Sequence, residues 1–339
     1  MKKILVTGGT GFLGLQIILQ ALQKGYDVRT TVRKDTGIKR IKAILQANKV
    51  DIQKLSFVKA DLSSGDNWNQ AMADRDYVLS VASPVFFNQP KNEMEAIKPA
   101  LDGTLRILKA AQANGVKRVV MTSNFGAIGF SKKSGLTTEK DWTDPNERGL
   151  SLYEKSKLLA EQAAWKYVEQ PDVEVKLTTI NPTAIFGPSL DRHVSGSFDL
   201  LKNLAVESKR KIPNMLLNVV DVRDVAAIHL LALEHPEAAG QRFIASADGQ
   251  ISMQEIVKLI QTKRPELSQK ISARMLPSWL IELLAPFNKA AQEGSLMMHI
   301  NRNISNQKAK DILHWLPRSS QGNAILAAVD SLVKYDYYK

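Results

Sequence analysis

The sequence predicts an α/β fold, a doubly wound parallel sheet with a smaller, mostly helical C-terminal lobe. Short β-branched runs alternate with helical patterns through the first half of the chain, and such alternation implies right-handed βαβ crossovers. A glycine-rich turn separates the first run from the first helical pattern. The alternation of strand and helix patterns ends after Gly187 and Pro188. We therefore expect one domain over residues 1–187 and a substrate lobe over 188–339, parts of which return to the sheet.

The expected elements follow one another in the order that a parallel sheet needs. Short β-branched runs predict buried strands at residues 3–7, 28–32, 55–59, 77–81, 116–121 and 173–180. Helical patterns between them predict helices at residues 12–24, 38–47, 67–73, 93–114 and 152–169. Shorter helical pieces follow in the C-terminal lobe.

Composition places the chain among ordinary globular proteins, with 44% hydrophobic and 24% charged residues in a length of 339. It has no cysteine, so neither disulfides nor thiol chemistry enter, and a reducing cytoplasm is the expected location. The N-terminal MKKILV is interrupted by Thr7–Gly11 before a signal peptide could form. The apolar stretch 276–287 is too short to span a bilayer and predicts a packed helix or a subunit contact. We expect no membrane partner.

The net charge of +12 raises nucleic acid as a partner. The densest basic runs, residues 29–42 and 209–211, have no interleaved aromatic residues, and we find no nucleic-acid motif. We therefore expect no nucleic-acid partner, and we interpret the second run as a solvated face. The five histidines lack metal-ligand spacing, so no metal site is expected.

The glycine-rich turn, VTGGTGFLG, has the spacing that a dinucleotide phosphate site needs. Gly8, Gly11 and Gly14 follow the first predicted strand and open the first helix. They allow a tight turn, close approach of a pyrophosphate and close helix–strand packing. The helix N-terminus adds free N–H groups and a partial positive charge. This context predicts a Rossmann-type site in which Thr10, Phe12 and Leu13 join the glycines.

The end of the second predicted strand indicates which dinucleotide binds. An NAD site usually has an acidic residue there, whereas this strand ends in Arg33 and no acid follows before Asp35. A guanidinium can hold a 2′-phosphate in bidentate fashion. We therefore expect NADP(H), with either Lys39 or Arg40 adding a second cation.

Tyr153 and Lys157, in the sequence YEKSK, lie four residues apart within a helix expected inside residues 150–169. This spacing places both side chains on one helix face. An ammonium group beside a phenol lowers the phenol's pKa, which suits a general acid that protonates a carbonyl oxygen.

Together these motifs resemble those of the extended short-chain dehydrogenase/reductases, in particular the dihydroflavonol reductase-like and cinnamoyl-CoA reductase-like aldehyde or ketone reductases. The resemblance runs from Lys2 to about Pro188 and continues more loosely to the C-terminus. It rests on TGGTGFLG, Val32–Arg33, Asp61–Leu62, Val81–Ala82–Ser83, YEKSK with its continuation LLAEQAAWKY, and Asn181–Pro182–Thr183.

The resemblance implies hydride transfer from NADPH to a carbonyl carbon while Tyr153 protonates the oxygen. Lys157 would bind the nicotinamide ribose. The other implied cofactor contacts are Asp61 and Leu62 at the adenine, Val81, Ala82 and Ser83 near the ribose and phosphates, Pro182 at the carboxamide, and Thr122, Ile185 and Ser197.

One position departs from the family pattern. The serine, or sometimes threonine, that hydrogen bonds to the substrate oxygen in this family corresponds to Asn124, with Ser123 just before it. Adjacent strand residues face opposite sides of a sheet, so the two side chains are not interchangeable. An asparagine NH₂ group can also donate a hydrogen bond. We keep both residues as catalytic candidates.

The substrate is expected to be a small aldehyde or ketone that tolerates an apolar or aromatic pocket. The pocket is predicted to draw on residues 85–87, the loop 125–148 and residues after Ile185, although some of the rings can equally be core. These rings are Phe86, Phe87, Phe125, Phe130 and Phe186. Two alternatives remain: a nucleotide-sugar epimerase or dehydratase on the same scaffold, and an NADP-sensing binding protein. We expect a monomer or a homodimer.

Overall fold

The computed structural model of the chain describes residues 1–83, 93–205, 211–272 and 274–338. Seven strands form its central sheet in the order β11-β6-β5-β4-β1-β2-β3. All six neighbouring pairs run parallel. The strands are β1 (Lys3–Val6), β2 (Asp27–Val32), β3 (Leu55–Lys59), β4 (Tyr77–Ser80), β5 (Arg118–Thr122), β6 (Lys176–Pro182) and β11 (Gln241–Ala245).

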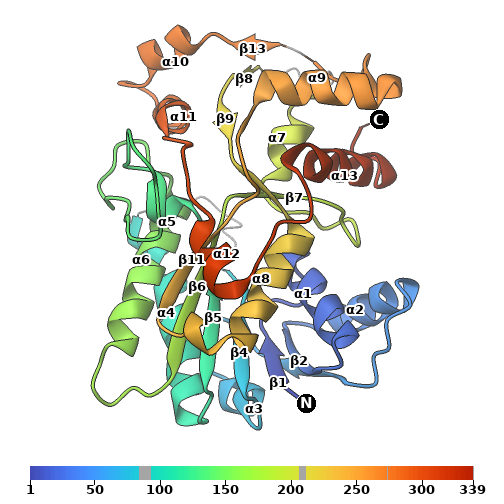
Figure 1. Ribbon diagram of the computed structural model, residues 1–339, viewed down its shortest axis with the longest axis vertical. Coiled ribbons are helices and arrows are strands. Elements are labelled where there is room, and N and C mark those ends of the chain that lie inside the picture. The colour runs from blue at the N-terminus through green and yellow to red at the C-terminus, as the bar shows by residue number, and fades with distance from the viewer. Residues whose placement is uncertain (84–92, 206–210, 273, 339) are drawn as a thin grey trace.

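Helices cover both faces of this sheet, as the alternating pattern predicts (Figure 1). On one face α4 packs against α6, and on the other α1 packs against α8. Residues of β5 alternate between the two cores, since Val119 and Met121 face the first pair while Val120 faces the second. The helices of this layer are α1 (Phe12–Gln23), α2 (Asp35–Ala47), α3 (Trp68–Met72), α4 (Glu93–Ala113), α5 (Gly126–Gly129), α6 (Leu152–Val168) and α8 (Val222–Glu234).

The strand order confirms the predicted doubly wound α/β fold class. From β1 the chain winds outward to β3, then returns to β4 on the other side of β1 and winds outward again. The carboxyl ends of β1 and β4 therefore flank the switch point, where ligands bind in open α/β sheets. The predicted strands and helices of the first half agree with the observed elements within a few residues.

The C-terminal lobe lies over the carboxyl ends of the strands (Figure 1). Its strands pair as β7 with β10, β9 with β12 and β8 with β13. Short 3-10 helices span Pro236–Ala238 and Pro265–Leu267. The other elements after β6 are β7 (Ala184–Phe186), α7 (Phe198–Lys202), β8 (Ile212–Pro213), β9 (Leu216–Leu217), β10 (Val219–Asp221), β12 (Ile251–Ser252), α9 (Met253–Lys263), β13 (Met275–Leu276), α10 (Ser278–Leu284), α11 (Lys289–His299), α12 (Gln307–Leu313) and α13 (Gln321–Lys334).

Two elements from the second half of the chain belong to the sheet layer. Strand β11 pairs with β6 along five residues, and α8 packs on α1. The C-terminal half thus contributes both to the sheet and to the lobe above it. The division between residues 187 and 188 stays a prediction.

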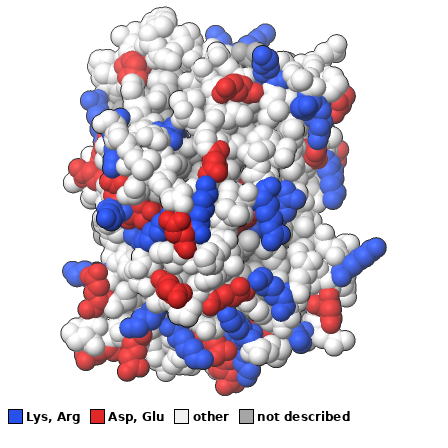
Figure 2. Space-filling view, viewed as in Figure 1, with Lys and Arg blue, Asp and Glu red and all other residues white. Residues whose placement is uncertain are grey.

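Two surface features bear on the predicted partners: the distribution of charged side chains and the apolar stretch 276–287. Figure 2 shows Lys and Arg interspersed with Asp and Glu over the visible face, with many uncharged residues between them. No helix in the parts of the chain that the structure describes combines the length and apolar character needed to cross a membrane. In the stretch 276–287, Ile281 is buried, but Trp279 and Phe287 are exposed, so the predicted packed helix buries only part of its apolar surface.

Candidate active site

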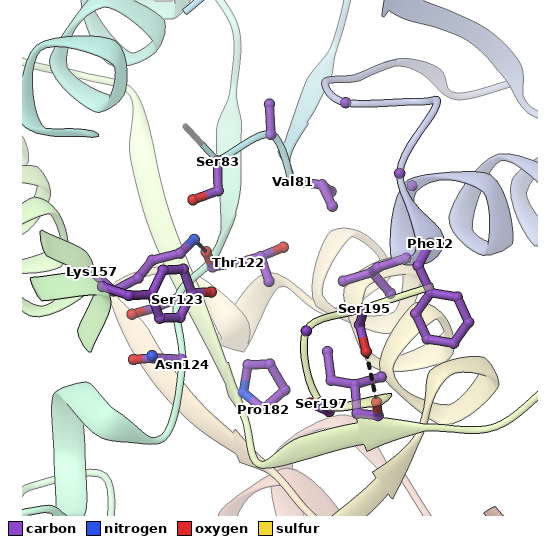
Figure 3. A pocket seen from close by; sticks show the side chains of 18 of the residues that line it. Phe12, Val81, Ser83, Thr122, Ser123, Asn124, Lys157, Pro182, Ser195 and Ser197 are labelled. Carbon is purple, nitrogen blue, oxygen red and sulfur yellow. Dashed lines mark hydrogen bonds between the residues drawn. The ribbon is translucent and has the colours of Figure 1, made fainter. Parts of the chain in front are cut away.

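A cavity of about 880 Å³ lies between the carboxyl ends of the strands and the C-terminal lobe. Figure 3 shows Lys157, Ser123 and Asn124 on one side of it, and Phe12, Ser195 and Ser197 on the other. Of the predicted site residues, all except Lys39 and Arg40 line this cavity. The predicted residues that it brings together are Gly8, Thr10, Gly11, Phe12, Leu13, Gly14, Arg33, Asp61, Leu62, Val81, Ala82, Ser83, Thr122, Ser123, Asn124, Tyr153, Lys157, Pro182, Ile185 and Ser197.

The turn between β1 and α1 has the geometry of a phosphate cradle. Gly8 has φ +72°, and a Cβ there would lie 2.9 Å from the Ala82 Cα. A Cβ at Gly14 would lie 2.3 Å from the Gly8 carbonyl oxygen. Helix α1 begins after Gly11 with no side-chain cap and no acidic residue in its first turn. Its first N–H groups are therefore open to an anion, and the turn fits a dinucleotide pyrophosphate.

The neighbouring strand ends hold the polar groups predicted for the adenosine portion of a cofactor. Asp61 accepts hydrogen bonds from the Ser63 backbone N (2.8 Å) and Oγ (2.7 Å). These bonds, the backbone one most, lower the pKa of Asp61 and keep it ionised. The backbone N atoms of Val81 and Ala82 both donate to Thr7 Oγ1 at 3.0 Å, which ties the end of β4 to the end of β1.

The structure distinguishes among the three basic residues predicted at a 2′-phosphate. Arg33 is exposed and lines the cavity. Arg40 forms an ion pair with Asp191 of the C-terminal lobe, and Lys39 is exposed outside the cavity lining. Arg33 is thus the one of the three that the fold places in the cavity wall.

Helix α6 carries the tyrosine and lysine. Its N-cap is Ser151, whose Oγ accepts a hydrogen bond from Glu154 N (3.2 Å), so Tyr153 and Lys157 lie in the first turns. Tyr153 lines the cavity, where 45% of its surface is exposed although protein atoms surround the side chain closely, whereas Lys157 is buried. Lys157 Nζ donates to the Thr122 carbonyl oxygen at 3.1 Å (Figure 3). Burial lowers the pKa of Lys157 to about 8, although the nearby Glu161 carboxylate acts in the opposite direction.

The prediction that Lys157 lowers the pKa of Tyr153 is wrong for this structure. The pKa of Tyr153 is raised to about 12, first by burial, which disfavours the phenolate, and then by the adjacent Glu154 carboxylate. The Lys157 ammonium, bonded to the Thr122 carbonyl, does not offset these effects. Tyr153 is therefore a neutral phenol at physiological pH.

Ser123 lies in the cavity wall, but its hydroxyl group points toward α6. Its buried Oγ donates to Glu161 Oε2 at 2.5 Å. Glu161 is fully buried and also accepts from Asn181 Nδ2 (2.7 Å) and Arg242 Nε (2.8 Å). Thr179 and Trp165 donate to the same carboxylate. The Ser123 hydroxyl thus belongs to a buried network that joins α6, β5, β6 and β11.

Asn124 has an amide that can donate into the cavity. Its Oδ1 accepts from Ala127 N (3.1 Å), which fixes the orientation of the amide group. Its backbone oxygen accepts from Asn181 Nδ2 at 3.1 Å. Nδ2 of Asn124 has no acceptor among the described residues, so it is available to a substrate oxygen.

Behind Thr122 lies a buried histidine that no sequence signal identified. His229 Nδ1 is 2.7 Å from the Val225 carbonyl and must donate to it, so Nε2 accepts from Thr122 Oγ1 (2.7 Å). Burial lowers the pKa of His229 to about 4. Thr122, which lines the cavity, is therefore hydrogen bonded on its other side to a neutral imidazole.

The far end of the cavity is built largely from residues that the sequence did not single out. Phe125 and Phe130 line it as predicted, and their rings lie 6.2 Å apart. Leu217, Asn218, Met297 and Arg302 join them from the C-terminal half. No motif or regular spacing marks these four positions.

The remaining predictions fall outside this cavity. Phe186 is fully buried and packs against Phe198 with ring centroids 5.7 Å apart, so it is core. Phe86, Phe87 and most of the basic run 209–211 lie outside the described residues. Within the described ranges, no three His, Cys, Asp or Glu side chains are grouped so that they could hold a metal.

The fold and the cavity define a class of protein. A parallel sheet whose switch point holds a glycine cradle, with a tyrosine and a lysine one helical turn apart in the same cavity, is the arrangement of a dinucleotide-binding short-chain dehydrogenase/reductase. The chain belongs to the NAD dependent epimerase/dehydratase family, whose sequence model matches residues 4–245. This membership confirms the resemblance inferred from the motifs.

Similar proteins are known from sequence and from structure. Anthocyanidin reductase of Vitis vinifera is 31% identical over 313 residues, covering 86% of this chain and 90% of that protein. The bifunctional dihydroflavonol 4-reductase/flavanone 4-reductase of Malus domestica is 34% identical, covering 78% and 77%. The structure of yeast methylglyoxal/isovaleraldehyde reductase Gre2 complexed with NADPH superposes with a TM-score of 0.80 and 26% identity, covering 99% of this chain and 100% of that chain.

Proposed function

We propose that this protein is an NADPH-dependent reductase that converts the carbonyl group of a small aldehyde or ketone to an alcohol, with Tyr153 as the proton donor. The observation that carries the proposal is a single cavity lined by the glycine cradle, Arg33, Tyr153 and Lys157. The similar reductases described above support it, and one of them was crystallised with NADPH.

The residues of the cavity fit NADP(H) along its whole length. The open N–H groups of α1 would hold the pyrophosphate, Arg33 the 2′-phosphate and Asp61 the adenine. Lys157, Pro182 and the backbone after it would hold the nicotinamide riboside. When bound, the cofactor supplies the hydride.

Side chains of the protein then stabilise and protonate the substrate oxygen as negative charge develops on it. Tyr153, with a pKa of about 12, keeps its proton until the oxygen becomes basic enough to take it. Asn124 Nδ2 donates a hydrogen bond to the same oxygen, which is the task of the family serine. Lys157, with a pKa of about 8, is largely protonated at neutral pH, so its ammonium group can donate hydrogen bonds to the nicotinamide ribose.

Neither alternative function is favoured by a particular contact. An epimerase or dehydratase usually has an acidic residue at the end of β2, where this chain has Arg33. A solved structure with UDP-glucuronic acid and NAD matches at 18% identity, which shows only a shared fold. A binding protein without catalysis would not need Tyr153 in the cavity.

A panel of aldehydes and ketones, incubated with NADPH or NADH, tests the proposal. We expect at least one member to be reduced to its alcohol with stoichiometric oxidation of NADPH, and more slowly with NADH. Stable NADPH across the whole panel, with tight NADPH binding measured calorimetrically, would favour the binding protein.

The role of Asn124 is tested by two exchanges, Asn124→Ser and Asn124→Ala. We expect the serine variant to retain most of the turnover, since its hydroxyl also donates, and the alanine variant to lose about 10- to 100-fold in kcat. Equal turnover in all three proteins would remove Asn124 from the mechanism.

We also propose that the protein is cytoplasmic and acts as a monomer or a homodimer. Light scattering coupled to gel filtration distinguishes these two states. Cell fractionation followed by immunodetection tests the location.

A further inference from the structure

We propose that Arg302 binds a carboxylate of the substrate, so that the preferred substrates are carbonyl compounds carrying a carboxylate group. This inference rests on the carbonyl reductase function proposed above and names the substrate class of that same cavity. It is drawn from the position and the partners of one buried guanidinium.

Arg302 is a nearly buried cation at the substrate end of the cavity. Only 9% of its surface is exposed, and it lines the cavity together with Met297 and Asn218. Its Nη2 donates to the Met297 carbonyl at 3.3 Å, whereas its Nε is buried without a hydrogen-bond partner. Among the described residues, no carboxylate forms an ion pair with it.

Two other buried arginines have more hydrogen-bond partners than Arg302, although Arg118 Nε and Arg242 Nη2 also lack a partner. Arg242 is equally buried, and its Nε contacts the Glu161 carboxylate at 2.8 Å. Arg118 donates to three backbone carbonyls that face its guanidinium. Arg302 donates to one carbonyl only, and burial lowers its pKa to about 10, so it remains a cation at neutral pH. A buried cation with so few partners is unfavourable unless a ligand compensates it.

The segment that carries Arg302 is fixed in place before a substrate binds. Asn218 Nδ2 donates to the Arg302 carbonyl oxygen at 3.1 Å. On either side, Asn301 Nδ2 donates to the Gly135 carbonyl (2.6 Å), and Thr137 N donates to the Asn303 carbonyl (2.9 Å). These bonds fix the backbone around Arg302, and the bond from Nη2 to the Met297 carbonyl orients the guanidinium.

The surroundings of Arg302 favour a carboxylate over a phosphate. The adjoining wall is apolar, with Phe125, Phe130 and Met297. Among the described lining residues, the other basic side chains are Arg33 at the adenosine end and Lys157, which donates to a backbone carbonyl. One guanidinium matches one carboxylate in charge and in its two-donor geometry, whereas a phosphate dianion usually has several cationic partners.

Glu154 is the acidic residue that could compete for Arg302, since it lines the same cavity. Its Oε2 instead accepts a hydrogen bond from Ser151 Oγ. Burial raises the pKa of Glu154 to about 7, so it is partly uncharged at neutral pH. It therefore leaves the Arg302 guanidinium available.

Matched substrate pairs test the inference. The pairs are 4-formylbenzoate with its methyl ester, and 4-oxobutanoate with its methyl ester, each reduced with NADPH. We expect the wild type to prefer at least one acid over its ester by about 10- to 100-fold in kcat/KM. Arg302→Met should abolish that preference by raising KM for the acid much more than KM for the ester. Arg302→Lys should retain part of it.

The outcomes separate this inference from the proposed function. Reduction of esters and acids at equal rates would overturn the carboxylate site and leave the reductase intact. Loss of both substrates equally in Arg302→Met would also overturn it. If neither pair is reduced, the binding of benzoate in the presence of NADP⁺ is measured by calorimetry. Benzoate binding to the wild type but not to Arg302→Met supports the carboxylate site. No benzoate binding to the wild type refutes it.

Discussion

The two ends of the cavity are built in different ways. The cofactor end comes from short segments that follow strands β1 to β4: the glycine cradle, Arg33, Asp61 and residues 81–83. The substrate end draws side chains from distant segments, among them Phe130, Asn218 and Arg302. The comparison teaches that cofactor binding is determined by local sequence, whereas substrate binding depends on how the C-terminal lobe packs on the sheet.

The two ends meet at β5 and α6, where Tyr153 and Lys157 lie. This junction is supported from beneath by the Glu161 network on one face of the sheet and by His229 on the other. Changes at the cofactor end, the substrate end and the junction should therefore have separable effects.

The largest effect is expected at the junction, from Tyr153→Phe. Removing the proton donor should lower kcat by about 10³-fold, the size usual for general acid catalysis. NADPH affinity, measured by calorimetry, should stay unchanged because the cofactor end is intact. The matched control is Tyr167→Phe on the same helix. A Tyr153→Phe variant with near wild-type turnover would remove Tyr153 as the acid.

The second largest effect is expected from Glu161→Gln, which should lower the stability of the folded protein and not act on catalysis directly. The exchange leaves the buried Arg242 guanidinium without its carboxylate, and we expect a loss of about 3–5 kcal/mol in the free energy of unfolding. Urea denaturation measures it, with Glu169→Gln, at the exposed C-cap of α6, as control. A variant as stable as the wild type would show that the network does not support the junction.

Arg33→Met should affect the cofactor end alone. We expect NADPH affinity to fall about 10- to 100-fold, since a charge-assisted contact to the 2′-phosphate is lost, while NADH affinity is unchanged. Arg40→Met is the matched control, because Arg40 is paired with Asp191. If Arg40→Met instead abolished the preference for NADPH, the assignment of Arg33 would be wrong.

A smaller effect is expected from His229, and it depends on pH. Its pKa is about 4 in the folded protein against 6.5 for the free side chain. Between these values the unfolded chain binds the additional proton, so the stability contributed by His229 is present above pH 6.5 and is lost as the pH falls. From pH 7.5 to 5, the wild type should lose about 2 kcal/mol more than His229→Gln. Equal losses in both proteins would show that the imidazole is not kept neutral.

Much of the fold and of the cofactor end could be predicted because the signals are local. Alternating apolar runs determine the parallel sheet, and three glycines at fixed spacing determine the cradle that Gly8 and Gly14 form. The position of Tyr153 and Lys157 on one helix face also follows from spacing alone.

The rest depends on tertiary packing that a single sequence does not display. Glu161 and Arg242 are 81 residues apart, and nothing in the sequence marks them as partners. Arg302 lies on a loop with no motif, so neither its burial nor its lack of a carboxylate could be anticipated. The pKa of Tyr153 was predicted in the wrong direction because the spacing of Tyr153 and Lys157 does not report burial, which is the main cause of the upward shift.

Isotope transfer tests the central claim, carbonyl reduction in this cavity, most directly. The protein is incubated with a reducible aldehyde or ketone and NADPH deuterated at the transferable position, and the product is analysed by NMR and mass spectrometry. We expect one deuterium at the carbinol carbon for each NADPH oxidised, and none after Tyr153→Phe on the same timescale. NADPH oxidation that leaves the product without deuterium, or product formation without NADPH oxidation, would contradict the account.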